Sequence, residues 1–145
     1  MDWQKLKTDA NAGSCVSQCV LGLAYLYGCG IDVNYGEAFR LLTAAAEQGS
    51  SRATLGLGYM YATGKGTALD IKQAIRYLEA VAAPSDSSDA FAARIALARI
   101  YSRSDGSANH DLAQYWYSAA LRIRDGEDDP DILEAEAYLR RAAGT

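Results

Sequence analysis

The residues of this sequence that could perform catalysis or bind a metal are three cysteines and one histidine. Cys29 and His110 are the residue types of a cysteine hydrolase, in which an imidazole activates a thiol. They stand at equivalent turns of different copies of the repeat described below, so we do not expect them to meet. His110 falls where the earlier copies carry helix-capping residues, which predicts a capping or loop role for it.

The cysteine spacing also argues against a disulfide or a zinc site. Cys15 and Cys19 lie one turn apart on a single predicted helix, a geometry that does not favour a bridge. An odd number of cysteines without framework or zinc-finger spacing predicts reduced thiols. The sequence therefore predicts no catalytic residue, no bound metal and no cofactor.

Two Gly-x-Gly segments, at residues 28–30 and 64–66, and one acidic segment, at 127–131, resemble ligand-binding loops at first sight. Neither glycine segment follows a predicted strand or has the Gly-x-x-x-x-Gly-Lys-Ser/Thr pattern of a phosphate loop. The acidic segment resembles a calcium-binding loop only in its charge. We predict turn glycines in the first two segments, and a solvated loop that caps the last helix in the third.

The composition is typical of one soluble globular domain. The 145 residues are 50% hydrophobic and 22% charged, which is enough for a single core. A net charge of −4 argues against general nucleic-acid binding, which needs a surplus of Lys and Arg. No apolar run approaches the ~20 residues that span a bilayer, and no signal-peptide core follows Met1. If Met1 is the native start, we expect a cytoplasmic protein that binds neither nucleic acid nor membrane.

An internal sequence repeat predicts the helices that carry the cysteines and the turns discussed above. Each copy has Leu, a small residue, Tyr and a glycine-containing turn at fixed spacing: Leu21-Gly22-x-x-Tyr25-x-x-Gly28-x-Gly30, Leu57-Gly58-x-x-Tyr61-x-x-Gly64-x-Gly66, and the weaker Leu97-Ala98-x-x-Tyr101-x-x-Ser104-x-Gly106. The Leu and Tyr mark the packed face of a first helix, and the glycines permit the turn that ends it. Residues 84–89 read as a longer loop between the second and third copies.

Capping signals then predict a second helix in each copy. Asn34 followed by Glu37, and Asp70 followed by Gln73, have capping-box spacing. Residues 1–11 look like the second helix of an incomplete repeat. Asp129 and Pro130 begin a last helix, whose charged side chains, Glu134 among them, are expected to face water.

These motifs resemble the Sel1-like repeat family, a relative of the tetratricopeptide repeat. The second copy shows the family pattern from Ala53 to Ala83, and the first differs from it at Ser17, Ile31 and Asn34. The resemblance implies an all-α fold, a right-handed α–α superhelix (solenoid) of about three repeats. We expect one domain over residues 1–145, with a half-repeat at 1–13, repeats at 14–49, 50–84 and 89–126, and a capping helix at 129–145.

The resemblance implies a scaffold or adaptor that binds a protein partner, not an enzyme. One alternative is a bacterial immunity protein that neutralises a cognate secreted toxin by direct binding. A second alternative, from cysteine-rich relatives, is a hydrolase acting on cell-wall or β-lactam ligands, although this chain lacks their cysteine pair in each repeat. Fold by itself does not decide between these roles.

In the related tetratricopeptide repeats, the first helix of each pair lines the concave, partner-binding face. The matching positions in this chain are Val16, Cys19, Leu23, Tyr27, Arg52, Leu55, Tyr59, Arg99 and Arg103. An apolar floor with an arginine cluster suits a helix or extended segment that carries acidic side chains. Alternatively, Val16, Leu23 and Leu26 pack on the N-terminal helix with Trp3 and Leu6, and the arginines are ordinary solvated residues.

Overall fold

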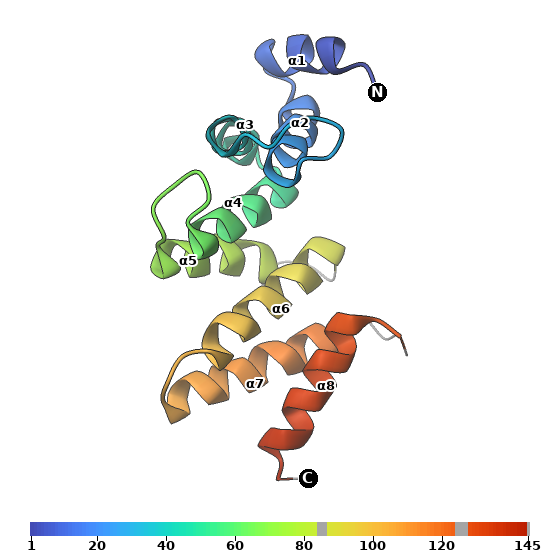
Figure 1. Ribbon diagram of the computed structural model, residues 1–145. Helices are drawn as coiled ribbons and strands as arrows, with labels where there is room; N and C mark the ends of the chain where they lie inside the picture. Colours follow the sequence, from blue (N-terminus) through green and yellow to red (C-terminus); the bar gives the residue numbers. More distant parts are fainter. Residues whose placement is uncertain (84–86, 124–127, 145) are drawn as a thin grey trace. The chain divides into compact units, whose positions relative to one another are not determined.

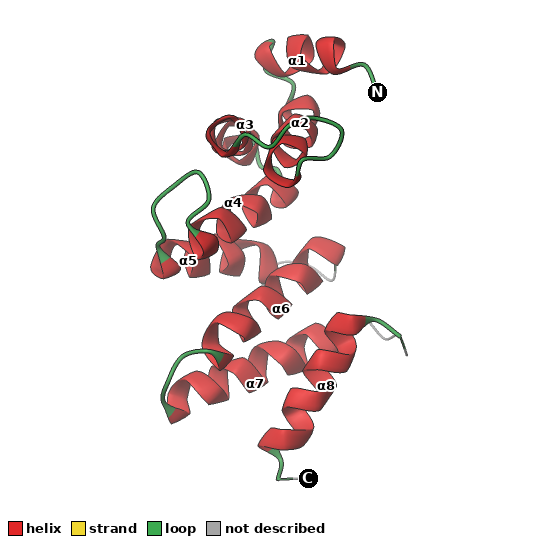
Figure 2. Ribbon diagram, in the orientation of Figure 1, coloured by secondary structure: helices red, strands yellow, loops and turns green. Residues whose placement is uncertain are grey.

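The computed structural model describes residues 1–83, 87–123 and 128–144, and within these ranges the chain is helical with no strand (Figure 2). The helices are α1 (Trp3–Asn11), α2 (Cys15–Tyr27), α3 (Tyr35–Glu47), α4 (Ser51–Thr63), α5 (Ile71–Ala82), α6 (Ser88–Ser102), α7 (Ser107–Leu121) and α8 (Pro130–Ala142). The predicted loop at 84–89 and the acidic segment at 127–131 fall partly outside the described residues. The chain divides into two compact units, Met1–Tyr77 and Leu78–Thr145.

The helix ends follow the predicted capping signals. Asn34 accepts a hydrogen bond from the Glu37 N–H at the start of α3, and Asp70 accepts one from the Gln73 N–H at the start of α5. Gly28 and Gly64 end α2 and α4 in the left-handed conformation, with φ of 70° and 69°. Since a side chain disfavours this conformation, the repeated glycines explain why both helices stop at the same repeat position.

In the first unit, α2 packs between α1 and α3, and α3 packs on α4 (Figure 1). Leu42 of α3 is fully buried, and a Cβ built on Gly22 would lie only 2.8 Å from its Cδ2. Gly56 approaches Leu42 from α4 in the same way, with a Cβ distance of 3.1 Å to its Cδ1. One leucine therefore fills the space left by glycines on two neighbouring helices.

The N-terminal helix covers a different surface from the one that the alternative interpretation assigned to it. Trp3 and Leu6 of α1 pack against the buried Leu21 and Leu41. Val16 is 73% exposed, so α1 does not cover it. The apolar side chain at the start of α2 is therefore presented at the surface.

In the second unit, α7 packs against both α6 and α8 (Figure 1). Its core includes Phe91 and Ile95 from α6, Tyr117 from α7, and Ile132 from α8. The sequence predicted that Glu134 faces water, and this prediction is wrong. Its side chain is only 39% exposed, because Arg99 and Tyr117 bind its carboxylate. Helix α8 is therefore held in this unit by apolar contacts and by an ion pair.

The all-α solenoid fold class predicted from the sequence is confirmed. Among the described helices, none combines the length and the hydrophobicity needed to cross a bilayer.

Substitution of Gly66 by Ala should destabilise the first unit severely. Gly66 has φ of 73°, and a Cβ there would lie 2.5 Å from the carbonyl oxygen of Tyr35. We expect the free energy of unfolding to fall by roughly 2–4 kcal/mol, from left-handed strain plus overpacking. Gly49→Ala is the matched control, because Gly49 also has positive φ but no heavy atom within 4 Å. Urea denaturation followed by circular dichroism compares the two, and an equal loss in both variants would refute the steric explanation.

Candidate functional site

The structure brings two of the predicted binding residues together on the first unit. Tyr27 ends α2, Tyr59 lies in α4, and their ring centroids are 6.0 Å apart with an interplanar angle of 42°. Tyr27 is 56% exposed, and Tyr59 is half-buried beside the core. The two rings form a partly exposed aromatic surface, the kind of surface that is enriched at protein interfaces.

Lys65 extends this surface with a positive charge. Its Nζ donates a hydrogen bond to the Tyr59 hydroxyl at 3.0 Å. The same atom lies 5.2 Å from the Tyr59 ring centroid and 5.7 Å from that of Tyr35, which is 37% exposed. These distances are typical of cation–π contacts. We call Tyr27, Tyr35, Tyr59 and Lys65 the tyrosine–lysine cluster.

The surroundings of Lys65 and Tyr27 raise the pKa of both side chains. The hydrogen bond to Tyr59 and the nearby tyrosines raise the pKa of Lys65, so its ammonium stays charged. Burial, and then the neighbouring Tyr59, raise the pKa of Tyr27, so its hydroxyl stays neutral. The cluster therefore presents aromatic rings, hydroxyl groups and one cation.

Sequence reasoning missed Tyr35 and Lys65. It assigned the Gly64-Lys65-Gly66 segment to a turn, which is correct, but gave its middle residue no role. A usable signal was present, because the middle position is Cys29 in the first copy and Asp105 in the third. A position that varies in charge between copies is not needed for packing.

The other predicted residues of the first unit fall into exposed and covered groups. Val16 and Arg52 are exposed in the first turns of α2 and α4. Leu23 and Leu55 are half-buried, and Cys19 is only 7% exposed within the core. Cys19 therefore contributes packing and presents little surface to a partner.

In the second unit, the predicted site residue Arg99 is already bound by carboxylates of the same chain. Its Nε and Nη2 donate to Glu134 at 3.0 and 2.8 Å, and its Nη2 also donates to Asp131 at 2.6 Å. The Tyr117 hydroxyl donates to Glu134 at 2.7 Å. The sequence predicted that a partner protein supplies acidic side chains to Arg99. In the structure, helix α8 of the same chain supplies them. Arg103 remains exposed at the end of α6.

The pKa shifts in this network follow from its hydrogen bonds and burial. The hydrogen bond from Arg99 holds the pKa of Glu134 below its ordinary value of 4.5. Burial, followed by the hydrogen bond to Glu134, raises the pKa of Tyr117 to about 12. The carboxylate is therefore ionised and the tyrosine protonated across the physiological range.

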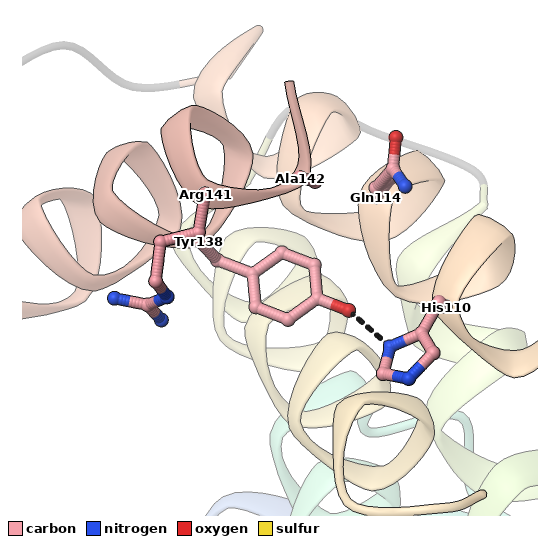
Figure 3. Close-up of a pocket in the computed structure, with 5 residues that line it drawn as sticks. All are labelled: His110, Gln114, Tyr138, Arg141 and Ala142. Carbon is pink, nitrogen blue, oxygen red and sulfur yellow. Dashed lines mark hydrogen bonds between the residues drawn. The ribbon is translucent and has the colours of Figure 1, made fainter. Parts of the chain in front are cut away.

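His110 does not cap a helix, and that prediction is wrong. The third copy has a shorter turn, over residues 103–106, so α7 begins at Ser107 and His110 lies inside its first turns. Gly106 precedes the helix without a side-chain capping bond. The His110 Nδ1 lies 2.9 Å from the Tyr138 hydroxyl, and Figure 3 draws this hydrogen bond. Both residues line a pocket of about 320 Å³, together with Gln114, Arg141 and Ala142.

The cysteines and histidine form no recognisable reactive centre within the described residues. No disulfide links the three cysteines, and no group of three or more His, Cys, Asp or Glu side chains gathers there as a metal site. Cys29 belongs to the first unit and His110 to the second.

Helix pairs that recur along the chain and pack on their neighbours define an α-helical repeat protein of the solenoid class. A sequence model of the Sel1 repeat matches residues 16–50, 51–83, 92–122 and 124–143. The chain therefore belongs to the Sel1 repeat family. Proteins of this family generally act as protein-interaction scaffolds.

Two solved structures are similar to the chain. The Sel1 repeat protein from Oxalobacter formigenes is 33% identical, with 97% of this chain and 98% of that chain covered and a TM-score of 0.64. The protective antigen c5321 of uropathogenic Escherichia coli strains, which displays an SLR fold, is 23% identical with a TM-score of 0.74. That alignment covers 97% of this chain and 32% of that chain, and it supports the fold alone. No curated protein matches the chain significantly.

Substitution of Glu134 by Gln should remove a pH-dependent part of the stability. Because the folded-state pKa of Glu134 is lowered, its ionised form stabilises the fold fully above the unfolded-state pKa near 4.5. This contribution is lost as the pH falls through the folded-state pKa. At pH ~7 we expect the variant to lose about 1–2 kcal/mol, discounted for partial exposure. The difference from the wild type should shrink below pH ~4.5.

Glu136→Gln is the control for this measurement. Glu136 lies on the same helix, is exposed, and approaches Arg140 only at 4.0 Å. We expect it to change the free energy of unfolding by less than about 0.5 kcal/mol at any pH. Urea denaturation of both variants across a pH series makes the comparison. A pH-independent loss in Glu134→Gln would contradict the assignment.

Proposed function

We propose that this chain is a non-catalytic scaffold that binds a helix or an extended segment of a partner protein on the exposed face of its first unit. The observation that carries this proposal is the ring pair formed by the exposed Tyr27 and the half-buried Tyr59. Tyrosine side chains supply large contact area at low entropic cost, and they dominate many interfaces. The exposed Val16 adds an apolar contact on α2, the helix that carries Tyr27.

The division of labour within α2 supports this role. Leu21, Ala24 and Leu26 are buried, so the helix already has the apolar stripe that its fold requires. Val16, Val20 and Tyr27 are large apolar residues that the fold leaves at the surface. Their spacing of four and seven residues places them on one face of α2, and this is the face that we expect a partner to cover.

The more specific roles differ in the partners that they require. An adaptor binds at least two partners at once, whereas an immunity protein binds one toxin and protects cells that express it. No feature of the described residues favours a toxin over another protein, so the immunity role stays a prediction from family resemblance. Hydrolysis of β-lactams or peptidoglycan fragments stays the least supported alternative, and we expect none.

Substitution of Tyr27 by Ala should weaken partner binding without unfolding the chain. Tyr27 is mostly exposed, so its loss removes contact area from the interface and little from the core. We expect the dissociation constant to rise about tenfold or more, as for an interface hot spot. The partner is captured with the wild-type chain, identified by mass spectrometry, purified, and titrated against each variant by calorimetry.

Tyr115→Ala is a closely matched control from the second unit. Tyr115 is 55% exposed, and its ring lies against that of Trp116 with centroids 5.0 Å apart. The control removes an aromatic side chain of equal exposure from a different surface. If Tyr115→Ala weakens binding and Tyr27→Ala does not, the proposed surface is wrong.

A further inference from the structure

Lys65 is a cation held among tyrosines with no carboxylate beside it. Its Nζ contacts the Tyr59 hydroxyl and the rings of Tyr59 and Tyr35, and no described Asp or Glu lies within 4.0 Å of it. Cation–π contacts place the charge but do not neutralise it. The cluster therefore has an unused capacity to bind one negative charge.

We infer that Lys65 and the Tyr59 hydroxyl together bind an Asp or Glu side chain of the partner segment, while the Tyr27 ring packs against an apolar residue next to it. This inference rests on the proposed function and adds the chemistry of the partner. The partner segment is one in which a carboxylate and an apolar side chain are neighbours.

The hydrogen-bonding inventory of the cluster fits a carboxylate. A lysine ammonium has three donors, and only one is used by the Tyr59 oxygen. Because that oxygen accepts, the Tyr59 hydroxyl proton is available to donate outward. The two donor atoms are 3.0 Å apart, so both reach the oxygens of one carboxylate in charge-assisted hydrogen bonds.

The backbone that carries Lys65 is held in place before any partner binds. Gly66 packs so closely on Tyr35 that a Cβ there would lie 2.5 Å from the Tyr35 carbonyl oxygen. The turn is also tied to α4 by the bond from the Lys65 N–H to the Met60 carbonyl oxygen at 3.2 Å. A fixed cation loses less conformational entropy on binding than a mobile one.

The second unit already contains the same recognition chemistry in occupied form. There, a cation and a tyrosine hydroxyl, Arg99 and Tyr117, both bind the carboxylate of Glu134. On the same helix, Ile132 is buried in the core of that unit. Arg99 and Tyr59 also share one repeat position, two residues after Leu97 and Leu57. The difference is that no carboxylate of the described chain occupies the first-unit cluster.

The experiment is a selection of peptides from a random displayed library on the intact chain, repeated on Lys65→Met and Lys72→Met. Lys72 is an exposed lysine of α5, so its substitution makes the same charge change away from the cluster. We expect the wild type and Lys72→Met to enrich peptides with Asp or Glu beside an apolar residue. Lys65→Met should lose this enrichment, and it should bind a selected wild-type peptide about tenfold more weakly. Replacing the acidic residue of that peptide by its amide should weaken binding to the wild type equally.

Three results would overturn the inference. If the selected peptides lose affinity for a Tyr27 variant but not for Lys65→Met, the proposed function stands and the inferred binding of a carboxylate by Lys65 is wrong. Selection of no peptide that needs either residue would count against both proposals. Concentration-dependent dimerisation that Lys65→Met abolishes would assign the carboxylate to a second copy of this chain. Lys65→Arg, which keeps the charge, should bind the selected peptide within a few-fold of the wild type.

Discussion

The structure of the first unit depends on close packing of glycine on one helix against leucine on the next. Leu42 is completely buried because Gly22 on α2 and Gly56 on α4 leave room for its methyl groups. A helix pair alone cannot cover such a leucine, so each pair must pack on its neighbour. This requirement explains why Leu, Gly, Ala and Tyr recur at fixed positions. The glycines that end α2 and α4 recur for a separate reason, because both adopt the left-handed backbone conformation. Substitutions at these positions are limited by packing, whatever the protein binds.

The copies differ at positions on the edge of this packing, where the residue type is less restricted. The position two residues after the repeat leucine is Leu23, Tyr59 or Arg99 in successive copies. Tyr59 helps to form a partly exposed surface with the Lys65 cation, whereas Arg99 forms ion pairs with two carboxylates of α8. The same repeat position thus contributes to a candidate binding surface in the first unit and to an ion pair between two helices in the second unit. Family membership indicates a protein-interaction scaffold in general, and it does not specify what the scaffold binds.

The sequence-based predictions are correct for contacts between residues close in the sequence, and they fail for contacts between residues far apart in the sequence. Capping by Asn34 and Asp70 is confirmed, because a cap depends on residues three positions away. The role of His110 was wrong because the prediction copied a repeat position without allowing for the shorter turn before α7. The exposure of Glu134 was wrong because its partners, Arg99 and Tyr117, are distant in the chain. The repeat named Tyr27 and Tyr59 separately as partner-facing residues, but neither their mutual contact nor the contribution of Lys65 was predicted.

The sequence by itself determined the all-α repeat class, the helix caps and turns of the first two copies, and the burial of the repeat leucines Leu21, Leu57 and Leu97. Each of these follows from local backbone preference or from a spacing that recurs along the chain. Only the tertiary structure decided what these two cations contact. Arg99 binds the carboxylates of Asp131 and Glu134, and Lys65 binds the uncharged hydroxyl of Tyr59 on α4. Long charged side chains have many rotamers and obey no periodicity, so their partners are chosen by whichever helix the fold brings within reach.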